Sequence, residues 1–114
     1  MHEVSVAESL LKIAVDECRR NGYSKISNVR VVIGKASGVM PEALLFAFDA
    51  LKTETIAAGA KLTIEEVPVA GHCTACSADF TTSESFVLCC PRCGCGSYTL
   101  HAGRELDIKE LEVD

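Results

Sequence analysis

The sequence predicts an α+β fold in which two helices pack on a small three-stranded mixed sheet, with a four-cysteine module inserted before the last strand. Two segments of the first half carry apolar residues at helical spacing, and three further segments have the composition and alternation of strands. Six of the seven cysteines fall within residues 73–95. Strand patterns both precede and follow this stretch, so we expect it to be an insertion and not a tail.

Residues 4–20 predict the first helix. Its apolar positions recur three or four residues apart, as on one buried face; they are Val4, Ala7, Leu11, Ala14, Val15 and Cys18. Two arginines fall in the last turn, and Asn-Gly at 21–22 is a typical helix end. Because Cys18 lies on the apolar face, we expect it to be a small buried side chain of the core.

Residues 26–33 predict a strand, and Pro41 suits the first position of a second helix, which we expect to end at Gly59. The apolar stripe of that helix comprises Leu44, Leu45, Phe48 and Leu51. Phe46 lies off the stripe, and we expect it to cover a second contact.

Residues 60–71 and 103–114 predict two more strands of one sheet. Each has a one-residue change in the phase of its apolar residues, which predicts a bulge or a change of burial partner. The predicted organisation is an α/β domain of residues 1–69 and 104–114 with an inserted module of residues 70–103.

Composition limits the classes of function. The 114 residues are 48% hydrophobic and carry a formal net charge of −5. An acidic chain is a poor general ligand for nucleic acid, and no apolar run is long enough to span a membrane. The N-terminus lacks the basic region and the long apolar region that a signal peptide has. We therefore expect a cytoplasmic protein that binds neither nucleic acid nor membrane.

The cysteine-rich stretch has the pattern of a metal site. Cys73 and Cys76 form one C-x2-C pair, Cys90 and Cys93 form another, and thirteen residues separate the pairs. Each pair lets the backbone turn so that both sulfurs face one ion, and four thiolates with no open position describe a structural zinc site. Gly94 can adopt the positive φ that often follows the second cysteine. The pattern therefore predicts a zinc-ribbon module with four cysteine ligands.

Several alternatives stay open for this module. Cys89 could replace Cys90 as a ligand, although C-x3-C is a poorer turn, and Cys89 and Cys95 are otherwise surplus thiols. His72 could compete with the neighbouring Cys73. Four thiolates at this spacing also hold iron in some proteins, so the spacing alone does not exclude iron.

The module has few large apolar side chains with which to build a core. Its aromatic residues are Phe80, Phe86 and Tyr98, so the bound ion must stabilise it. Residues 79–82 and 85–89 predict a short hairpin between the two cysteine pairs.

The chain opens with Met1, His2 and Glu3. The α-amine of Met1, the amide nitrogen and imidazole of His2, and the Glu3 amide can form adjacent chelate rings on one metal. An all-nitrogen set of this kind favours Ni(II) or Cu(II) in square-planar geometry. The first amides of a helix have no intrahelical acceptor, so a metal can take them without breaking the helix. The opposing interpretation is an ordinary chain end with no role.

The whole chain closely resembles the HypA/HybF family of nickel-incorporation proteins for hydrogenase and, in some species, urease maturation. The resemblance rests on the opening "MHE", the paired "CTAC" and "CPRCG", and three longer segments, "GKASGVMPEALLFAFDAL", "GAKLTIEEVPV" and "GRELDIKELEV".

The resemblance implies a zinc site at Cys73, Cys76, Cys90 and Cys93 and a nickel site at His2, with the Met1 amine and the Glu3 backbone as co-ligands. It implies structural Zn²⁺ and transient Ni²⁺. It also implies a non-enzymatic metallochaperone whose partners are a nickel-maturation GTPase and the hydrogenase large-subunit precursor. A homodimer is left open.

Two rival functions make different predictions. A nucleic-acid-binding zinc ribbon would need a basic face, but the module's arginines are opposed by acidic residues; these charges are Arg92 and Arg104 against Asp79, Glu84 and Glu105. A thiol redox enzyme would need a reactive thiol of low pKa at Cys89 or Cys95. The sequence has no phosphate-binding loop, so any GTPase is another protein.

Overall fold

The computed structural model describes residues 2–85 and 87–114 and forms two compact units. The first, which we call the helical unit, comprises the chain up to Val32 with Val39–Glu65 and Asp107–Asp114. The second, the cysteine unit, comprises Ile33–Gly38 and Glu66–Leu106. The sequence predicts a separate domain of residues 70–103 beside one of residues 1–69 and 104–114. This division stays a prediction.

Helix α1 spans His2–Arg20, and its buried face agrees in large part with the predicted stripe. The buried residues are Val6, Ala7, Leu10, Leu11, Ala14 and Cys18. Val4 and Val15, which were predicted to be core residues, are only partly buried at its margin. Cys18 is 2% exposed, as expected of a core side chain, and burial raises the pKa of its thiol.

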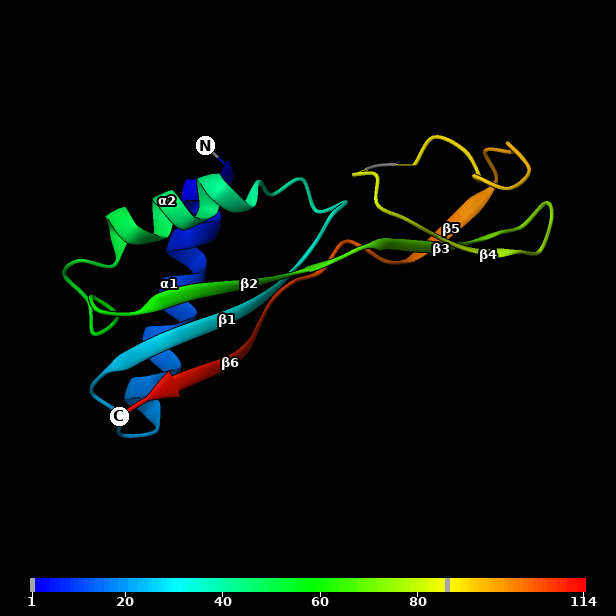
Figure 1. Cartoon of the computed structure of the whole chain (residues 1–114). Helices are drawn as coiled ribbons and strands as arrows, with labels where there is room; N and C mark the ends of the chain where they lie inside the picture. The colour runs from blue at the N-terminus through cyan, green and yellow to red at the C-terminus, as the bar shows by residue number, and fades with distance from the viewer. Residues whose placement is uncertain (1, 86) are drawn as a thin grey trace. The chain divides into compact units, whose positions relative to one another are not determined.

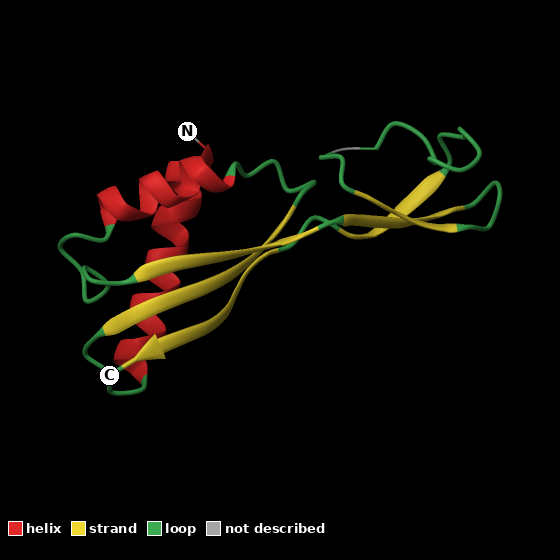
Figure 2. Ribbon diagram, viewed as in Figure 1, coloured by secondary structure: helices red, strands yellow, loops and turns green. Residues whose placement is uncertain are grey.

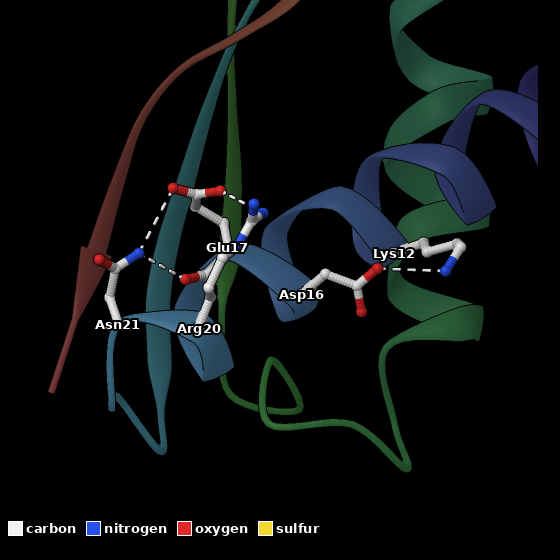
Figure 3. A network of polar contacts seen from close by, with 5 residues as sticks. All are labelled: Lys12, Asp16, Glu17, Arg20 and Asn21. Atoms are coloured by element: carbon white, nitrogen blue, oxygen red, sulfur yellow. Dashed lines mark hydrogen bonds and ion pairs between the residues drawn. The ribbon is translucent and has the colours of Figure 1, made fainter.

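The opposite face of α1 carries a polar network, which Figure 3 shows from close by. Lys12 pairs with Asp16 at 3.1 Å, and Arg20 pairs with Glu17 at 2.7 Å. The Asn21 side chain donates to the backbone oxygen of Glu17 at 2.7 Å and so satisfies a carbonyl of the last turn. Exposed pairs at this spacing each stabilise a helix by about 0.2–0.5 kcal/mol.

Helix α2 spans Pro41–Leu51, with Pro41 in its first turn, and buries Leu44, Ala47 and Phe48. Two side-chain predictions for this helix were wrong. Leu45 is 38% exposed, and Phe46, expected to cover a second contact, is 79% exposed.

The helix also ends well before Gly59. The Thr55 hydroxyl donates to the Lys52 carbonyl at 2.7 Å and accepts from the Ala57 amide at 3.0 Å. These local bonds favour turns over further helix, because they give the backbone partners that are not helical.

The first sheet has the order β2-β1-β6, formed by Lys61–Val67, Ile26–Gly34 and Leu106–Val113 (Figure 1). The amide of Asp114 donates to the carbonyl of Lys25 at 2.9 Å, which places the end of β6 beside the start of β1. The two strands therefore run antiparallel. The predicted three-stranded sheet with two helices is confirmed, and Figure 2 shows α1 passing behind its strands.

The second sheet has the order β4-β3-β5 and lies in the cysteine unit. It is formed by Asp79–Thr82, Val69–Cys73 and Tyr98–Ala102, and both pairings are antiparallel. The change of phase after Ile64 marks a change of sheet, because β2 ends at Val67 and β3 begins at Val69. The predicted hairpin was wrong: β4 pairs with β3, and residues 85 and 87–89 form bends and coil. Phe86 lies outside the described residues.

Two glycines of the cysteine unit approach each other closely. A Cβ atom on Gly34 would lie 2.1 Å from the carbonyl carbon of Gly103. Gly103 has a φ of 115°, and a Cβ atom there would lie 2.8 Å from the Cα atom of Val69. Any side chain at position 34 would therefore have to displace backbone.

The variant Gly34→Ala is expected to lower the free energy of unfolding by about 1–3 kcal/mol, the usual cost of overpacking. Urea denaturation of the metal-loaded protein measures it. Gly59→Ala is the matched control, because a Cβ atom there meets nothing within 4 Å. An equal loss in the two variants would show that the contact with Gly103 is not the cause.

Among the residues that the structure describes, no helix is both long and apolar enough to cross a membrane.

Candidate metal centres

The first cysteine pair lies at the end of β3. Cys73 is the last residue of that strand, and the chain then turns back so that the Cys73 amide donates to the Ala78 carbonyl at 2.9 Å. Ser77 completes the turn with a φ of 58°. Within it, the amide of Cys76 donates to the Cys73 sulfur at 3.5 Å, which stabilises the thiolate form.

The second pair has a similar turn. The amide of Arg92 points at the Cys90 sulfur over 3.4 Å, and the Gly94 amide donates to the Cys90 carbonyl at 2.8 Å. Gly94 has a φ of 78°, which confirms the expected left-handed position. A local turn and an amide aimed at sulfur therefore occur at both pairs.

The two turns bring together the four predicted zinc ligands, Cys73, Cys76, Cys90 and Cys93. Their sulfur atoms all lie within 4.8 Å of one another. The Cys73–Cys93 sulfurs are 3.6 Å apart, and the Cys76–Cys90 sulfurs are 3.9 Å apart. Zinc–sulfur bonds of about 2.3 Å in a tetrahedron put sulfurs about 3.8 Å apart. The arrangement fits one zinc ion with no open coordination position.

Cys73 and Cys93 influence each other's ionisation. The Cys76 amide is the largest influence on Cys73 and, with nearby thiols, lowers its pKa to about 6. At Cys93 the Cys95 amide lowers the pKa, but the neighbouring Cys73 sulfur, burial and the other thiols outweigh it and raise the pKa to about 12. Adjacent negative sulfurs repel one another, so a divalent cation is what allows all four to be thiolates.

The surplus thiols lie outside this cluster of four sulfurs. Cys89 is exposed, and Cys95 is half-buried against the small core of the cysteine unit. The Cys95 carbonyl accepts from the Cys90 amide at 2.7 Å, so Cys95 supports the second turn through its backbone. His72 lies on β3 with its Nδ1 atom 2.9 Å from the Asp79 carboxylate, a partner that competes with any metal.

The cysteine unit has a small apolar core. Cys73, Phe80 and Cys90 are its buried members, so two of the four thiols also belong to the core. The Phe80 and Tyr98 rings meet edge to face with centroids 6.0 Å apart, and the Tyr98 hydroxyl donates to the Val87 carbonyl. Among the described residues this core is small, which supports the expectation that a bound ion stabilises the unit.

The second candidate centre lies at the start of α1. The His2 side chain is 57% exposed, and its Nδ1 atom lies 3.9 Å from the Glu3 carboxylate. Since the helix begins at His2, the first amides are those without an intrahelical acceptor. Met1 lies outside the described residues, so its predicted role as a ligand stays a prediction.

The structure adds a contact that the sequence did not reveal. The backbone N–H of Met40 donates to the Glu3 carboxylate at 3.1 Å. Met40 is the N-cap residue of α2, and its side chain makes no capping hydrogen bond. The Glu3 carboxylate of α1 instead accepts a hydrogen bond from the backbone N–H at the start of α2. The contact joins residues far apart in the chain, and no local motif signals it.

This contact has a consequence for the pKa of Glu3. The Met40 N–H bond is the largest cause that lowers it, followed by the amide of Glu3 itself. Because the pKa of Glu3 is lower in the folded state, the contact stabilises the fold fully at pH values above the unfolded-state pKa of about 4.3. This contribution is lost as the pH falls through the folded-state pKa.

An NMR pH titration of the Glu3 side-chain carboxyl measures this pKa and should place it below about 4.3. In Met40→Pro, which lacks the N–H donor, the pKa should return upward. An identical titration in both proteins would contradict the assignment.

Comparison with known proteins identifies the family. The HypA family, described as hydrogenase/urease nickel incorporation, metallochaperone, matches residues 1–113. The chain belongs to the HypA family. It is a nickel-incorporation metallochaperone of hydrogenase maturation and not an enzyme.

Curated HypA relatives match over their full length. The hydrogenase maturation factor HypA of Albidiferax ferrireducens is 40% identical over 114 residues, and that of Solidesulfovibrio magneticus is 41% identical over 117 residues. In both comparisons 100% of each chain is covered.

Solved HypA structures share the fold. The solution structure of the Ni metallochaperone HypA from Helicobacter pylori is 27% identical, with a TM-score of 0.69 over 97% of this chain and 96% of that one. A second solution structure of a HypA protein has a TM-score of 0.72 at 28% identity, over 99% of this chain and 96% of that one.

Proposed function

We propose that the chain binds Ni(II) at its N-terminus and delivers it for [NiFe]-hydrogenase maturation, while Cys73, Cys76, Cys90 and Cys93 hold a structural zinc ion. The nickel ligands are the Met1 amine, the His2 amide and imidazole, and the Glu3 backbone nitrogen. Nickel is cargo in this proposal, and zinc is resident.

The observation that carries the proposal is the position of His2 in the first turn of α1 with an exposed imidazole. Amides at this position are free of helical hydrogen bonds, so their nitrogens can bind a metal without loss of secondary structure. The adjacent Glu3 carboxylate offsets part of the repulsion between a cation and the positive end of the helix dipole.

The two ligand sets account for the division between resident and transported metal. Four thiolates, two of them buried, leave no position for an entering ligand. A protein that accepts nickel can approach a set of nitrogen ligands around an exposed imidazole. Copper would bind such nitrogens more tightly than nickel, so the choice of nickel must come from partners and metal supply.

The proposed partners of the chain are a nickel-maturation GTPase and the hydrogenase large-subunit precursor, and urease is a second client class. The family and the seven cysteines, which are free thiols in the structure, support a reducing cytoplasmic location. The acidic net charge of −5 argues against nucleic acid as a partner.

A deletion strain tests the function directly. Hydrogenase activity should fall without the gene, return when the chain is supplied, and stay low with His2→Ala at limiting nickel. Ser5→Ala, an exposed change in the same helix, is the control and should restore activity. Restoration by His2→Ala equal to that by the unchanged chain would contradict the proposed site.

A further inference from the structure

The cysteine unit holds a free thiol that lies against the proposed zinc ligands. Cys95 is half-buried and packs against the small core to which Cys73 and Cys90 belong. Its backbone contacts both members of the second cysteine pair. The Cys95 amide donates to the Cys93 sulfur, and the Cys95 carbonyl accepts from the Cys90 amide at 2.7 Å. Cys95 is therefore fixed beside the cluster of four sulfurs, although its own sulfur is not part of it.

The bond from the Cys90 amide brings Cys90 and Cys95 within reach of a disulfide. With an N···O distance of 2.7 Å, standard bond lengths hold the two Cα atoms no more than about 6.6 Å apart. Bridged cysteines have Cα atoms about 4.4–6.8 Å apart. The Gly94 amide donates to the Cys90 carbonyl at 2.8 Å, so the turn itself maintains this approach. The two residues can therefore be bridged without a large movement of the backbone.

The exposed thiol of Cys89 is not placed to form the same bond. Neighbouring residues joined by a trans peptide have Cα atoms about 3.8 Å apart, and ordinary disulfides need at least about 4.4 Å. In the zinc-loaded protein the four ligand sulfurs share their electron pairs with the ion. Cys95 is therefore the unbound thiol that can both react with an oxidant and reach a ligand.

We propose that Cys90 and Cys95 form an oxidation site, at which a peroxide joins the two residues in a disulfide and so releases the zinc ion. The inference rests on the proposed zinc site. It assigns a role to one of the two surplus thiols, which the proposed function leaves without one.

The reaction balances with one molecule of hydrogen peroxide. The Cys95 sulfur attacks the O–O bond, which breaks, so that Cys95 becomes a sulfenic acid and one oxygen leaves as water. The Cys90 sulfur then attacks the Cys95 sulfur, the S–O bond breaks, and the hydroxide takes a proton from solvent to leave as water. The two sulfurs together lose two electrons, and the two peroxide oxygens gain them.

The disulfide removes one of the four ligands. A zinc ion is held by thiolate sulfur, and a structural site of this kind has no spare ligand. Cys90 is 1% exposed, so its sulfur cannot easily be replaced by solvent. Zinc release should therefore follow the disulfide, and a dithiol reductant should reverse the change by thiol–disulfide exchange.

The test treats the untagged, zinc-loaded chain with hydrogen peroxide and follows released zinc with a chromogenic chelator. Mass spectrometry after alkylation of the free thiols maps the disulfides, and trypsin, which cleaves after Arg92, places Cys90 and Cys95 on separate peptides. Zinc release and the Cys90–Cys95 disulfide should appear together, one ion for each disulfide. Dithiothreitol with added zinc should restore the original zinc content.

Two serine variants separate the surplus thiols. Cys95→Ser should bind zinc, form no such disulfide and release the ion severalfold more slowly under peroxide. Cys89→Ser is the matched control and should form the same disulfide at the rate of the unchanged chain. Equally fast release by Cys95→Ser would overturn the inference. If Cys95→Ser holds no zinc, the disulfide map of the unchanged chain decides, and disulfides among the four ligands or to Cys89 alone would overturn it.

The zinc content before peroxide treatment separates this inference from the proposed function. A chain that holds one zinc ion at the four cysteines and forms no Cys90–Cys95 disulfide keeps the proposed zinc site and overturns the inference. A chain that holds no zinc at these cysteines overturns both.

Discussion

Replacing Cys73 by Ala should release the zinc ion and unfold the cysteine unit, while the helices of the other unit stay folded. Cys73 contributes both a ligand and a buried side chain of the small core. Structural zinc sites contribute roughly 10–16 kcal/mol of apparent binding free energy, which is also folding free energy for the segment that holds the ion. A core built around Phe80 and Tyr98 cannot replace a term of that size.

Metal analysis gives the zinc content of this variant, and NMR amide dispersion reports on each unit separately. Cys89→Ala is the matched control, because it removes a neighbouring thiol that lies outside the cluster of four sulfurs. It should retain one zinc ion per chain. Full zinc content in Cys73→Ala, or zinc loss in Cys89→Ala, would show that the assigned ligands are wrong.

The second large effect is expected from His2→Ala, which should abolish specific nickel binding with little change in zinc content or thermal stability. The imidazole anchors the proposed chelate, and without it only backbone nitrogens remain. The side chain is 57% exposed at the start of α1, so its removal costs little packing.

Nickel calorimetry on zinc-loaded protein measures this effect. His72→Ala serves as the control, since His72 pairs with Asp79 on the second sheet and is not a proposed nickel ligand. Equal losses in the two variants would indicate a general effect of histidine removal. Unchanged affinity in His2→Ala would show that the opening residues are not the site.

The elements that the sequence predicted well are those with strong local signals. The apolar spacing of α1, the strand predicted over residues 26–33 and the paired C-x2-C turns each reflect short-range geometry. The separation of β2 from β3 after Val67 was predicted only as a change in the phase of the apolar residues within 60–71.

The features that the sequence did not predict depend on contacts between distant segments. Strand β5 pairs with β3 across most of the cysteine unit, so no local pattern identifies its partner. The bond between the Glu3 carboxylate and the Met40 amide is equally non-local. Leu45 and Phe46 are apolar but exposed in the structure, and residue type alone does not separate a buried position from an exposed one.

The proposed nickel site requires the terminal amine and His2 together, and a change at the amine alone tests this. Nickel affinity and X-ray absorption geometry are compared for the untagged protein and a form extended by several residues before Met1, so that no free amine lies within chelating reach of the His2 imidazole. The extension converts the amine to an amide while His2 remains, so we expect weaker binding in a geometry that is no longer square planar. Equal affinity and the same geometry in both forms would contradict it.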